Sequence, residues 1–431
     1  MPLAETLSQG DEVVTGQVVD TNAAWLASRF VELGFEVGRH TVVGDRLADI
    51  VAVAKEIAGR GALCVCTGGL GPTSDDLTAE AIAVAFDRPL LFDPEAMAQI
   101  EARYASAGRV MAETNRKQAW FPAGAERIDN AWGTAPGFAV AEKGTRFVFL
   151  PGVPREMKSM FDSLVAPDLL SRFRLQPGRL VTLRVVGLGE SDIQQRLAGL
   201  VWPDGIVFGT RTQLPENHVK LRCTPTVTAD VIGALVAEVR RRVGAHVFAV
   251  EGLPGTPEVD TQGGPLVEVV SRLLAARGQT VAVAESCTGG RLAAAFTSVP
   301  GASGWFSEGI VSYANAAKSR LLEVAPSLLA EHGAVSEPVA RAMAEGCRKG
   351  AQTTWALAVT GVAGPGGGTE TKPVGTVFIA LAGPVGTLCR SFRLPGDRDR
   401  VQSLTVATAL DLLRRTLLTN SFPNVPPVEP A

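Results

Sequence analysis

Two apolar runs in this chain end in the same string, Cys-Thr-Gly-Gly, and each leads directly into a helical pattern. The runs are ALCVCTGG at 62–69 and VAVAESCTGG at 281–290. A short apolar run closed by glycines is typical of a buried strand, and strands that alternate with helices predict a mostly parallel, doubly wound sheet. This order fills residues 1–170 and returns from about 265. The sequence therefore predicts two α/β domains with mainly parallel sheets.

The segment between these two domains has a different pattern. Two strand-like runs, RLVTLRVVGLGES and HVKLRCTPTV, are followed by the helical run DVIGALVAEVRRRVG. We therefore expect a small α+β domain at 171–255, with a linker or turn region rich in Gly and Pro at 251–265. The second α/β domain is predicted at 256–420. The Pro-rich end at 421–431 is expected to be disordered.

Length and charge exclude several function classes. At 431 residues the chain is long enough for two or three domains. Its formal net charge of −3 lacks the basic excess of a nucleic-acid-binding protein, so no nucleic-acid partner is expected. No apolar run is long enough to cross a bilayer, and the first residues lack a basic-then-apolar leader, which predicts a cytoplasmic protein without a membrane partner. The histidines and cysteines show no metal-site or disulfide spacing, so Cys64 and Cys66 are expected to be small buried side chains.

The first glycine turn is followed by a pair of aspartates. Gly68, Gly69 and Gly71 precede Asp75 and Asp76. Glycines at a strand end let the backbone approach a phosphate, and the following helix start favours an anion. Two carboxylates beside a phosphate require a bridging cation, for which a magnesium-like ion is the simplest choice. The alternative is that these aspartates only cap the helix.

Further polar residues follow the two preceding strands. They are Gly10, Asp11, Glu12, Asn22 and Asp45. The carboxyl ends of parallel strands meet at one sheet edge, where ligands bind in open α/β folds. We expect the acidic groups to gather at that edge, which favours a phosphate and metal site over simple helix capping.

The second glycine turn is preceded by a serine. Ser286 ends the apolar run, and the N–H groups of residues 287–290 are expected to be unpaired at the start of the next helix. Such donors suit a phosphate or a developing oxyanion, and the serine suits a nucleophile. The alternative is that Ser286 is a helix N-cap. Because no histidine lies in a suitable motif, a Ser-His-Asp triad is not supported.

A lysine in the run SYANAAKSRLLEV is the candidate base. Asn315 is expected to be an N-cap, which places Lys318 in the first helical turn. There the positive end of the helix dipole favours the neutral amine that a general base requires. Tyr313, at the strand end before this helix, is expected to relay a proton or to orient the lysine. The alternative is an exposed lysine and a packed tyrosine.

A third loop, TGVAGPGGGTETKPVGT at 360–376, follows another strand. Thr360 and Gly361 stand at the strand end and are candidate ligand contacts, whereas a glycine-rich string by itself often marks only a flexible lid. Arg398 and Arg400 precede the last helix. Arginine suits a phosphate, although arginines before a helix are commonly solvated.

The motifs of the first domain resemble those of a known family. In this order, GDEVVTGQVVDTNA, VGD, TGGLGPTSDDLT and LPGVPREM resemble the N-terminal domain of the CinA family (competence/damage-inducible protein A), which is similar to molybdopterin-binding proteins. The resemblance implies an ADP-ribose pyrophosphatase that forms AMP and ribose 5-phosphate with a divalent metal (Mg, Co or Mn), aided by potassium. It implies Asp45 and Asp76 as the acidic, metal-binding pair. The candidate substrate contacts of this domain are Gly10, Asp11, Glu12, Asn22, Gly68, Gly69, Gly71, Thr73, Pro151 and Gly152.

The motifs of the last domain resemble the C-terminal CinA domain. They are AESCTGG, SYANAAK, VTGVAGPGGG and GDRDRVQ. The resemblance implies a nicotinamide mononucleotide (NMN) amidohydrolase, which forms nicotinic acid mononucleotide and ammonia and requires no metal. In this assignment Ser286 is the nucleophile, Lys318 the base and Tyr313 an assisting group. The candidate substrate contacts are Glu285, Thr288, Gly289, Gly290, Thr360, Gly361 and Arg400.

The middle segment resembles the KH-like module that separates the two domains in this family. Gly187 and Gly189 do not have the spacing of an RNA-clamping GXXG loop, so we expect a structural or dimer-forming role and a homodimer. The first hypothesis is a two-site enzyme of pyridine-nucleotide salvage that acts on NMN and ADP-ribose. The second is an NMN deamidase whose first domain only binds a nucleotide or pterin. The third is a non-enzymatic, competence-associated protein.

Overall fold

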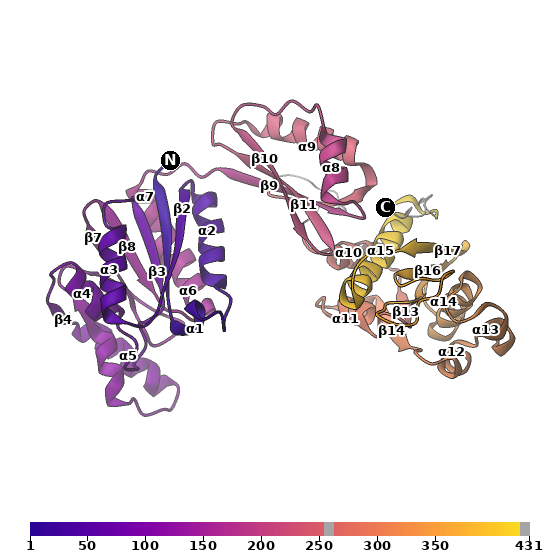
Figure 1. Cartoon of the computed structure of the whole chain (residues 1–431), viewed down its shortest axis with the longest axis horizontal. Helices are drawn as coiled ribbons and strands as arrows, with labels where there is room; N and C mark the ends of the chain where they lie inside the picture. Colours follow the sequence, from indigo (N-terminus) through magenta and orange to yellow (C-terminus); the bar gives the residue numbers. More distant parts are fainter. Residues whose placement is uncertain (254–262, 423–431) are drawn as a thin grey trace. The chain divides into compact units, whose positions relative to one another are not determined.

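The computed structural model describes residues 1–253 and 263–422 of the chain. The chain divides into two compact units, Met1–Arg179 and Leu180–Ala431. Each unit contains a sheet with a parallel centre and antiparallel strands along one edge, which confirms the predicted α/β class (Figure 1). The domain boundaries predicted at 170 and 255 remain predictions. Of the predicted linker and tail, residues 254–262 and 423–431 lie outside the described residues.

The first unit is built on a six-stranded sheet with the order β2-β1-β3-β8-β7-β6. Its strands are β1 (Leu3–Gln9), β2 (Glu36–Val43), β3 (Leu63–Thr67), β6 (Glu126–Ile128), β7 (Gly137–Glu142) and β8 (Thr145–Leu150). The first four strands in this order are parallel, and β7 and β6 are antiparallel to their neighbours. The carboxyl ends of β1, β2 and β3 therefore lie at one edge.

Helices cover both faces of this sheet (Figure 1). Successive residues of a strand point to opposite faces. Cys64 and Cys66 accordingly pack in the core on one face, and Leu63 and Val65 pack in the core on the other. Both cysteines are buried, as predicted. The helices are α1 (Asp11–Val14), α2 (Thr21–Leu33), α3 (Leu47–Ile57), α4 (Thr78–Ala85), α5 (Pro94–Ser106), α6 (Pro154–Met160) and α7 (Ala166–Arg172), with β4 (Leu90–Phe92), η1 (Glu113–Ala119), β5 (Trp120–Pro122) and η2 (Phe161–Val165) between them.

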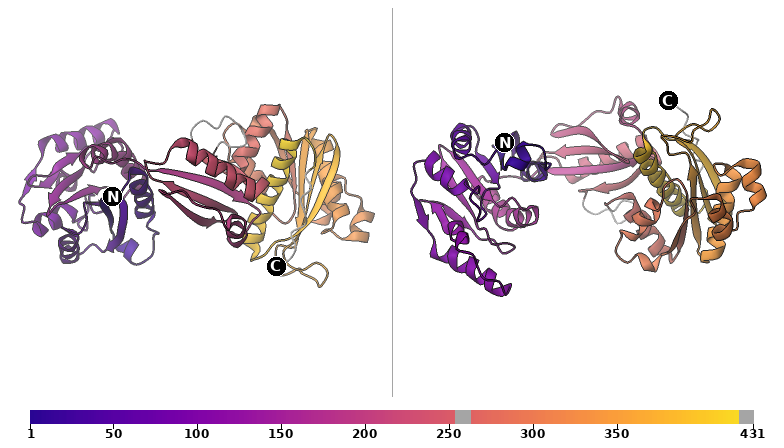
Figure 2. Two further views of the ribbon diagram at one scale, coloured as in Figure 1. Left: turned by 90° about the horizontal axis from the view of Figure 1, so that it is seen from above. Right: turned by 60° about the horizontal axis from the view of Figure 1, so that its bottom comes forward.

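The second unit contains two sheets (Figure 2). The four-stranded sheet has the order β10-β11-β9-β12, and the five-stranded sheet has the order β14-β13-β15-β16-β17. The smaller sheet consists of β9 (Arg179–Val186), β10 (Ile206–Gln213), β11 (Glu216–Cys223) and β12 (Val247–Glu251), with α8 (Glu190–Leu197), α9 (Ala229–Val243) and η3 (Gly244–His246). This small α+β arrangement matches the pattern predicted for the middle segment. Its KH-like assignment remains a prediction.

The five-stranded sheet carries the second CTGG turn. Its strands are β13 (Val281–Glu285), β14 (Phe306–Val311), β15 (Trp355–Gly361), β16 (Thr376–Gly383) and β17 (Gly386–Arg393). β14, β13 and β15 are parallel, and β16 and β17 are antiparallel. Its helices are α10 (Leu266–Arg277), α11 (Arg291–Thr297), η5 (Ala302–Gly304), α12 (Asn315–Leu322), α13 (Pro326–His332), α14 (Glu337–Ala351) and α15 (Arg398–Thr419).

The two faces of this sheet differ in side-chain size. On one face Ala282, Ala284, Ala356 and Ala358 pack with residues of α14. On the other face larger side chains of β13, β15 and β16 pack against α10, α11 and α15. The small side chains let α14 approach the backbone of the central strands, whose ends carry the candidate active site. None of the described helices is long and apolar enough to span a membrane.

Candidate active sites

Ser286 and Lys318 lie together at the end of β13. The Ser286 N–H donates to the carbonyl of Val359 at 3.0 Å, which extends the β13–β15 pairing by one residue and fixes the serine beside the sheet. The Lys318 Nζ lies 3.0 Å from Ser286 Oγ. Its other partners are the carbonyl oxygens of Ser312 at 2.7 Å and Tyr313 at 3.2 Å. Lys318 is only 1% exposed, so the alternative prediction of an exposed lysine is wrong.

Burial lowers the pKa of Lys318 below its ordinary value of 10.5. This cause differs from the expected helix dipole. The helix also begins one residue earlier than predicted, because Ala314 is the N-cap and Asn315 is the first helical residue. A neutral amine has two N–H donors and one lone pair. The two carbonyl oxygens can accept both donors, which leaves the lone pair for the Ser286 hydroxyl proton.

Glu285, the residue before the nucleophile, caps the following helix. Its carboxylate accepts the N–H groups of Gly290 at 3.0 Å, Leu292 at 3.0 Å and Ala293 at 2.8 Å. The side chain is fully buried, so these bonds compensate the cost of burying its charge. Glu285 was predicted as a substrate contact, but in this structure it holds the turn. Gly290 has φ +101° there, a conformation that favours glycine.

The expectation that all four N–H groups of residues 287–290 are unpaired is therefore wrong. Gly289 donates to the carbonyl of Ser286 at 3.3 Å, and Gly290 donates to Glu285. The N–H groups of Cys287 and Thr288 have no hydrogen-bond partner among the described residues. The hydroxyl of Thr288 is also buried without a partner there. These two N–H groups are the candidate oxyanion donors of this turn.

Gln402 holds the same turn from α15. Its Nε2 donates to the carbonyl oxygen of Cys287 at 2.7 Å. Because the C=O and N–H of one peptide group point in opposite directions, this bond turns the N–H of Thr288 away from α15. The thiol of Cys287 is a bystander in this arrangement, since burial raises its pKa to about 12.

Tyr313 and the glycine-rich loop meet at Arg398. Tyr313 is 62% exposed, so it is not a packed core tyrosine. Its phenol oxygen accepts a hydrogen bond from Arg398 at 3.1 Å, and the same guanidinium donates to the carbonyl of Gly364 at 2.8 Å. Tyr313 therefore contacts the Lys318 amine through its backbone carbonyl, whereas its phenol is directed to Arg398.

The other predicted contacts of this site have structural partners. Thr360 is buried, and its hydroxyl donates to the carbonyl of Ala334 at 2.8 Å. A Cβ on Gly361 would lie 2.8 Å from the carbonyl oxygen of Thr376, so the neighbouring strand requires glycine. Arg400 is exposed and donates its backbone N–H to Asp397, which caps α15. The arginine joined to Tyr313 is thus Arg398 rather than Arg400.

The first unit has a cavity of about 430 Å³ at the carboxyl ends of its parallel strands. We call it the acidic pocket. Its lining residues are Gln9, Gly10, Glu12, Asp45, Gly68, Gly69, Leu70, Gly71, Pro72, Asp75, Asp76, Gln118, Thr134, Ala135, Pro151, Gly152, Val153 and Glu156. Five of these described residues are carboxylates and none is Lys or Arg. The predicted gathering of acidic groups at one sheet edge is therefore present.

Three of the predicted contacts, Asp11, Asn22 and Thr73, are not among these lining residues. The side chain of Asp11 accepts the N–H of Asp45 at 3.1 Å, and the Asp11 N–H returns a bond of 2.9 Å to the Asp45 carboxylate. Asn22 donates to the carbonyl of Gly152 at 2.8 Å. Thr73 donates its N–H to Asp76 at 2.8 Å. These residues fix the loops that the ligand would contact.

The acidic pocket fits a cation. Five carboxylates without a lining basic residue would repel a phosphate, so a positive ion is needed to bring an anionic substrate close. No cluster of three or more His, Cys, Asp or Glu side chains in the described ranges is arranged to hold a metal ion by itself. An ion at this site would need oxygen ligands beyond the side chains, from a substrate or from water. A Cβ on Gly71 would lie 2.4 Å from Asp76 Oδ2, so glycine keeps this carboxylate accessible.

Comparisons with known proteins show to which family this chain belongs. A model described as the CinA C-terminal domain matches residues 264–417, and one described as a probable molybdopterin binding domain matches residues 5–171. A CinA-like protein from Anaeromyxobacter sp. (strain Fw109-5) is 47% identical over 423 residues, which are 97% of this chain and 100% of that relative. The chain belongs to the CinA family. A CinA-like protein from Geobacter sulfurreducens is 44% identical over 420 residues, with 96% and 99% of the two chains covered.

Solved structures of CinA relatives match parts of the chain. A CinA superfamily protein from Klebsiella pneumoniae is 36% identical and covers 36% of this chain and 96% of its own, with a TM-score of 0.35. Membership of the CinA family fits a role related to pyridine nucleotides.

Sequence reasoning missed several residues of these CinA sites. Gln402 does not stand out in the sequence, because α15 also buries Thr405, Asp411, Arg414 and Thr416, and the partner of Gln402 is 115 residues away. Gln118 lines the acidic pocket from η1, which follows no strand, and Glu156 lines it from α6, four residues after Gly152. The acceptors of the Lys318 amine are backbone carbonyls, which no side-chain pattern reveals.

Proposed function

We propose that the second unit is an NMN amidohydrolase that forms nicotinic acid mononucleotide and ammonia. The observation that carries this proposal is the 3.0 Å approach of the buried Lys318 amine to the Ser286 hydroxyl. Membership of the CinA family supports the substrate, because the sequence motifs around both residues resemble the family's amidohydrolase domain.

The chemistry uses groups of the chain itself. Neutral Lys318 accepts the Ser286 proton while Oγ attacks the carboxamide carbon, and the N–H groups of Cys287 and Thr288 stabilise the oxyanion. The lysine then donates its proton to the departing amine, so ammonia leaves and an acyl-serine ester remains. Water, deprotonated by the same amine, attacks the ester and releases the carboxylic acid. Ser286 recovers its proton in this last step.

Ammonia release from NMN tests this proposal. Ser286→Ala should lower the rate to the background level, because Ser286 Oγ is the hydroxyl that lies within hydrogen-bond distance of the Lys318 amine. Ser298→Ala, which removes an exposed hydroxyl from the next helix end, is the matched control and should keep the wild-type rate. Deamidation by Ser286→Ala at the rate of this control would contradict the assignment.

We propose that the first unit hydrolyses ADP-ribose to AMP and ribose 5-phosphate. The acidic pocket at the strand ends supports a cation-dependent reaction of a diphosphate. Asp45 and Asp76 would hold a divalent cation, which supplies charge neutralisation and water activation. Gly68 and Gly69 let the backbone come close to the phosphates. A second candidate is a nucleotide- or pterin-binding module without hydrolysis, which the molybdopterin-binding family match favours.

AMP formation from ADP-ribose with Mg²⁺, Mn²⁺ or Co²⁺ separates these two candidates. Asp45→Asn and Asp76→Asn should each lower the rate at least about 100-fold, because each removes one of the two proposed anionic metal ligands. Asp49→Asn, on the exposed side of α3, should not change it. Both pocket variants should keep full NMN deamidation. Wild-type protein that binds ADP-ribose but forms no AMP with any of these ions would favour the binding module.

A further inference from the structure

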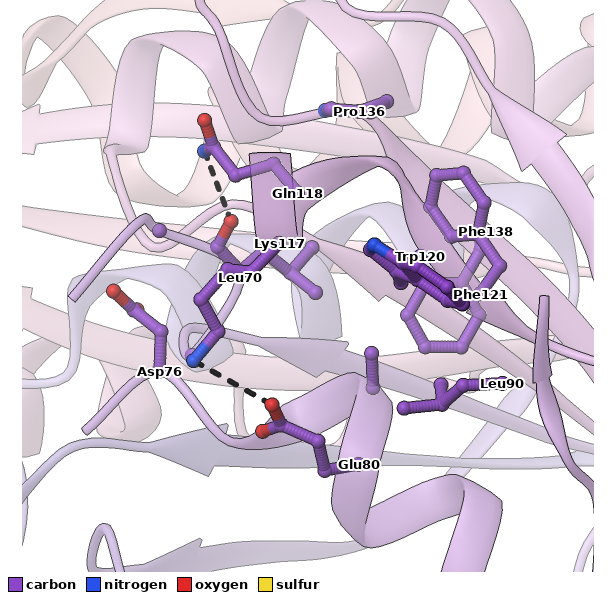
Figure 3. Close-up of a pocket in the computed structure, with 13 residues that line it drawn as sticks. Leu70, Asp76, Glu80, Leu90, Lys117, Gln118, Trp120, Phe121, Pro136 and Phe138 are labelled. Atoms are coloured by element: carbon purple, nitrogen blue, oxygen red, sulfur yellow. Dashed lines mark hydrogen bonds and ion pairs between the residues drawn. The ribbon is translucent and has the colours of Figure 1, made fainter. Parts of the chain in front are cut away.

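A second cavity in the first unit adjoins the acidic pocket. It has a volume of about 320 Å³, and we call it the aromatic pocket (Figure 3). It shares Gly69, Leu70, Gly71, Asp76 and Gln118 with the acidic pocket. Its other lining residues are Ala79, Glu80, Leu90, Lys117, Trp120, Phe121, Pro136 and Phe138. A ligand whose charged part lies over the acidic pocket can therefore extend into the aromatic pocket without crossing protein.

The two cavities differ in chemistry. No described residue that lines the acidic pocket is aromatic, whereas three rings line the aromatic pocket. Phe121 and Phe138 are buried and form its inner wall, and Trp120 is 41% exposed. Figure 3 shows Trp120 and Phe121 on the side of the pocket away from Asp76. Flat apolar walls with a partly exposed indole suit a planar ring.

Polar groups stand at the opposite rim. The Lys117 Nζ lies 3.7 Å from Glu80 Oε1 and 3.0 Å from the carbonyl of Thr73, and Gln118 donates to the carbonyl of Leu70 at 3.1 Å. The second carboxylate oxygen of Glu80, Oε2, is buried and has no hydrogen-bond partner among the described residues. An unpaired buried acceptor is costly, so a ligand donor that reached this oxygen would remove that cost.

We propose that the aromatic pocket binds the nucleobase of a nucleoside diphosphate whose phosphates lie over the acidic pocket. The base stacks on Trp120, and an exocyclic amine of the adenine type donates to Glu80. This inference rests on the proposed function of the first unit and adds the part of the substrate that is recognised. A terminal sugar without a base would gain nothing from three aromatic rings, and it remains on the side of the acidic pocket.

Equilibrium binding of AMP and of ribose 5-phosphate, measured by titration calorimetry with Mg²⁺, tests the proposal. Trp120→Ala should weaken AMP binding about 5- to 150-fold, which is the loss of one stacked base, and should leave ribose 5-phosphate binding unchanged. Trp120→Phe should keep AMP binding within a few-fold because it retains a ring. An unchanged melting temperature of the first unit in both variants shows that its fold is retained.

A comparison of AMP with IMP tests the role of Glu80. IMP lacks the exocyclic amine, so wild-type protein should bind it at least about 5-fold more weakly than AMP, and Glu80→Gln should reduce this preference. Equal affinities of wild-type and Trp120→Ala protein for AMP would overturn the base site. Equal weakening of AMP and ribose 5-phosphate, or wild-type protein that binds no AMP, would also overturn it.

These outcomes are distinct from a failure of the proposed hydrolysis. If AMP binding depends on Trp120 but ADP-ribose is not cleaved, the base site stands and the pyrophosphatase proposal fails. If ADP-ribose is cleaved equally well by wild-type and Trp120→Ala protein at subsaturating substrate, the pyrophosphatase proposal stands and the base site fails.

Discussion

Replacement of Lys318 by methionine tests the link between burial and catalysis. Methionine has a similar length, so it fills most of the space of the side chain and removes only the amine. The rate of NMN deamidation should fall by about 10²- to 10⁴-fold, which is the usual contribution of a general base. Lys318→Arg should be equally impaired, because a guanidinium stays protonated. Lys349→Met, an exposed lysine on α14, is the matched control.

The lowered pKa of Lys318 also predicts how the free energy of unfolding changes with pH. Because burial lowers the pKa of Lys318 in the folded state, the unfolded chain binds more protons between that lowered pKa and 10.5. The folded state therefore gains stability as pH rises through this window, and the gain is about 1.4 kcal/mol for each unit by which the pKa is lowered. Lys318→Met cannot titrate. The difference in unfolding free energy, wild type minus variant, should consequently increase from pH 7 towards pH 10.

Two measurements check this reasoning. Urea unfolding of wild type, Lys318→Met and Lys349→Met at pH 7 and pH 10 gives the stability differences. The pH profile of kcat/KM for NMN should rise with pH and level off above the lowered pKa in the wild type. A stability difference that does not change between the two pH values would refute the inferred pKa direction. Lys318→Met protein with more than a tenth of wild-type activity would refute the role of the amine.

Two further predictions concern the turn around Ser286. Glu285→Gln should lower the free energy of unfolding by about 1.5–3 kcal/mol, the worth of a charged hydrogen bond, because an amide cannot accept all three backbone N–H groups. Thermal unfolding beside the exposed control Glu308→Gln measures this, and equal melting temperatures would contradict the capping role. Gln402→Leu should lower kcat for NMN more than it changes KM, because it frees the Cys287–Thr288 peptide. Gln402→Glu, which has the same shape but no donor when ionised, should show the same defect, and a normal kcat in both variants would dismiss the positioning role.

The fold class could be predicted because its signal is local. Apolar runs such as 62–67 and 281–285, each followed by a glycine turn and a helix, are the strands β3 and β13 of the structure. The acidic groups after β1, β2 and β3 line one pocket because parallel strands end at one edge. The N-cap of α12 was predicted one residue too late, at Asn315, since an N-cap signal does not decide between adjacent residues when Ala314 has the extended backbone of a cap.

The details of the second site depend on tertiary contacts. The motifs indicated Ser286 and Lys318 as site residues. The two are 32 residues apart in the sequence, and the pairing of β13 with β14 brings them together. Glu285 stands at a strand end, where a carboxylate suggests a ligand contact. Its capping role depends on how the backbone folds back as far as Ala293, and the sequence does not show this fold. The site roles of all these residues stay predictions until the variants are measured.

The carboxylate of Glu285 has a consequence for where an anionic ligand can bind in the second unit. In many α/β proteins the start of the helix after a strand receives the ligand's anion. Here the Glu285 carboxylate already accepts hydrogen bonds from N–H groups at the start of α11, so this helix end has its anion without a ligand. These N–H groups are therefore not free to bind the phosphate of the proposed mononucleotide substrate. Arg398 and Arg400, exposed at the start of α15, are cations suited to such a phosphate.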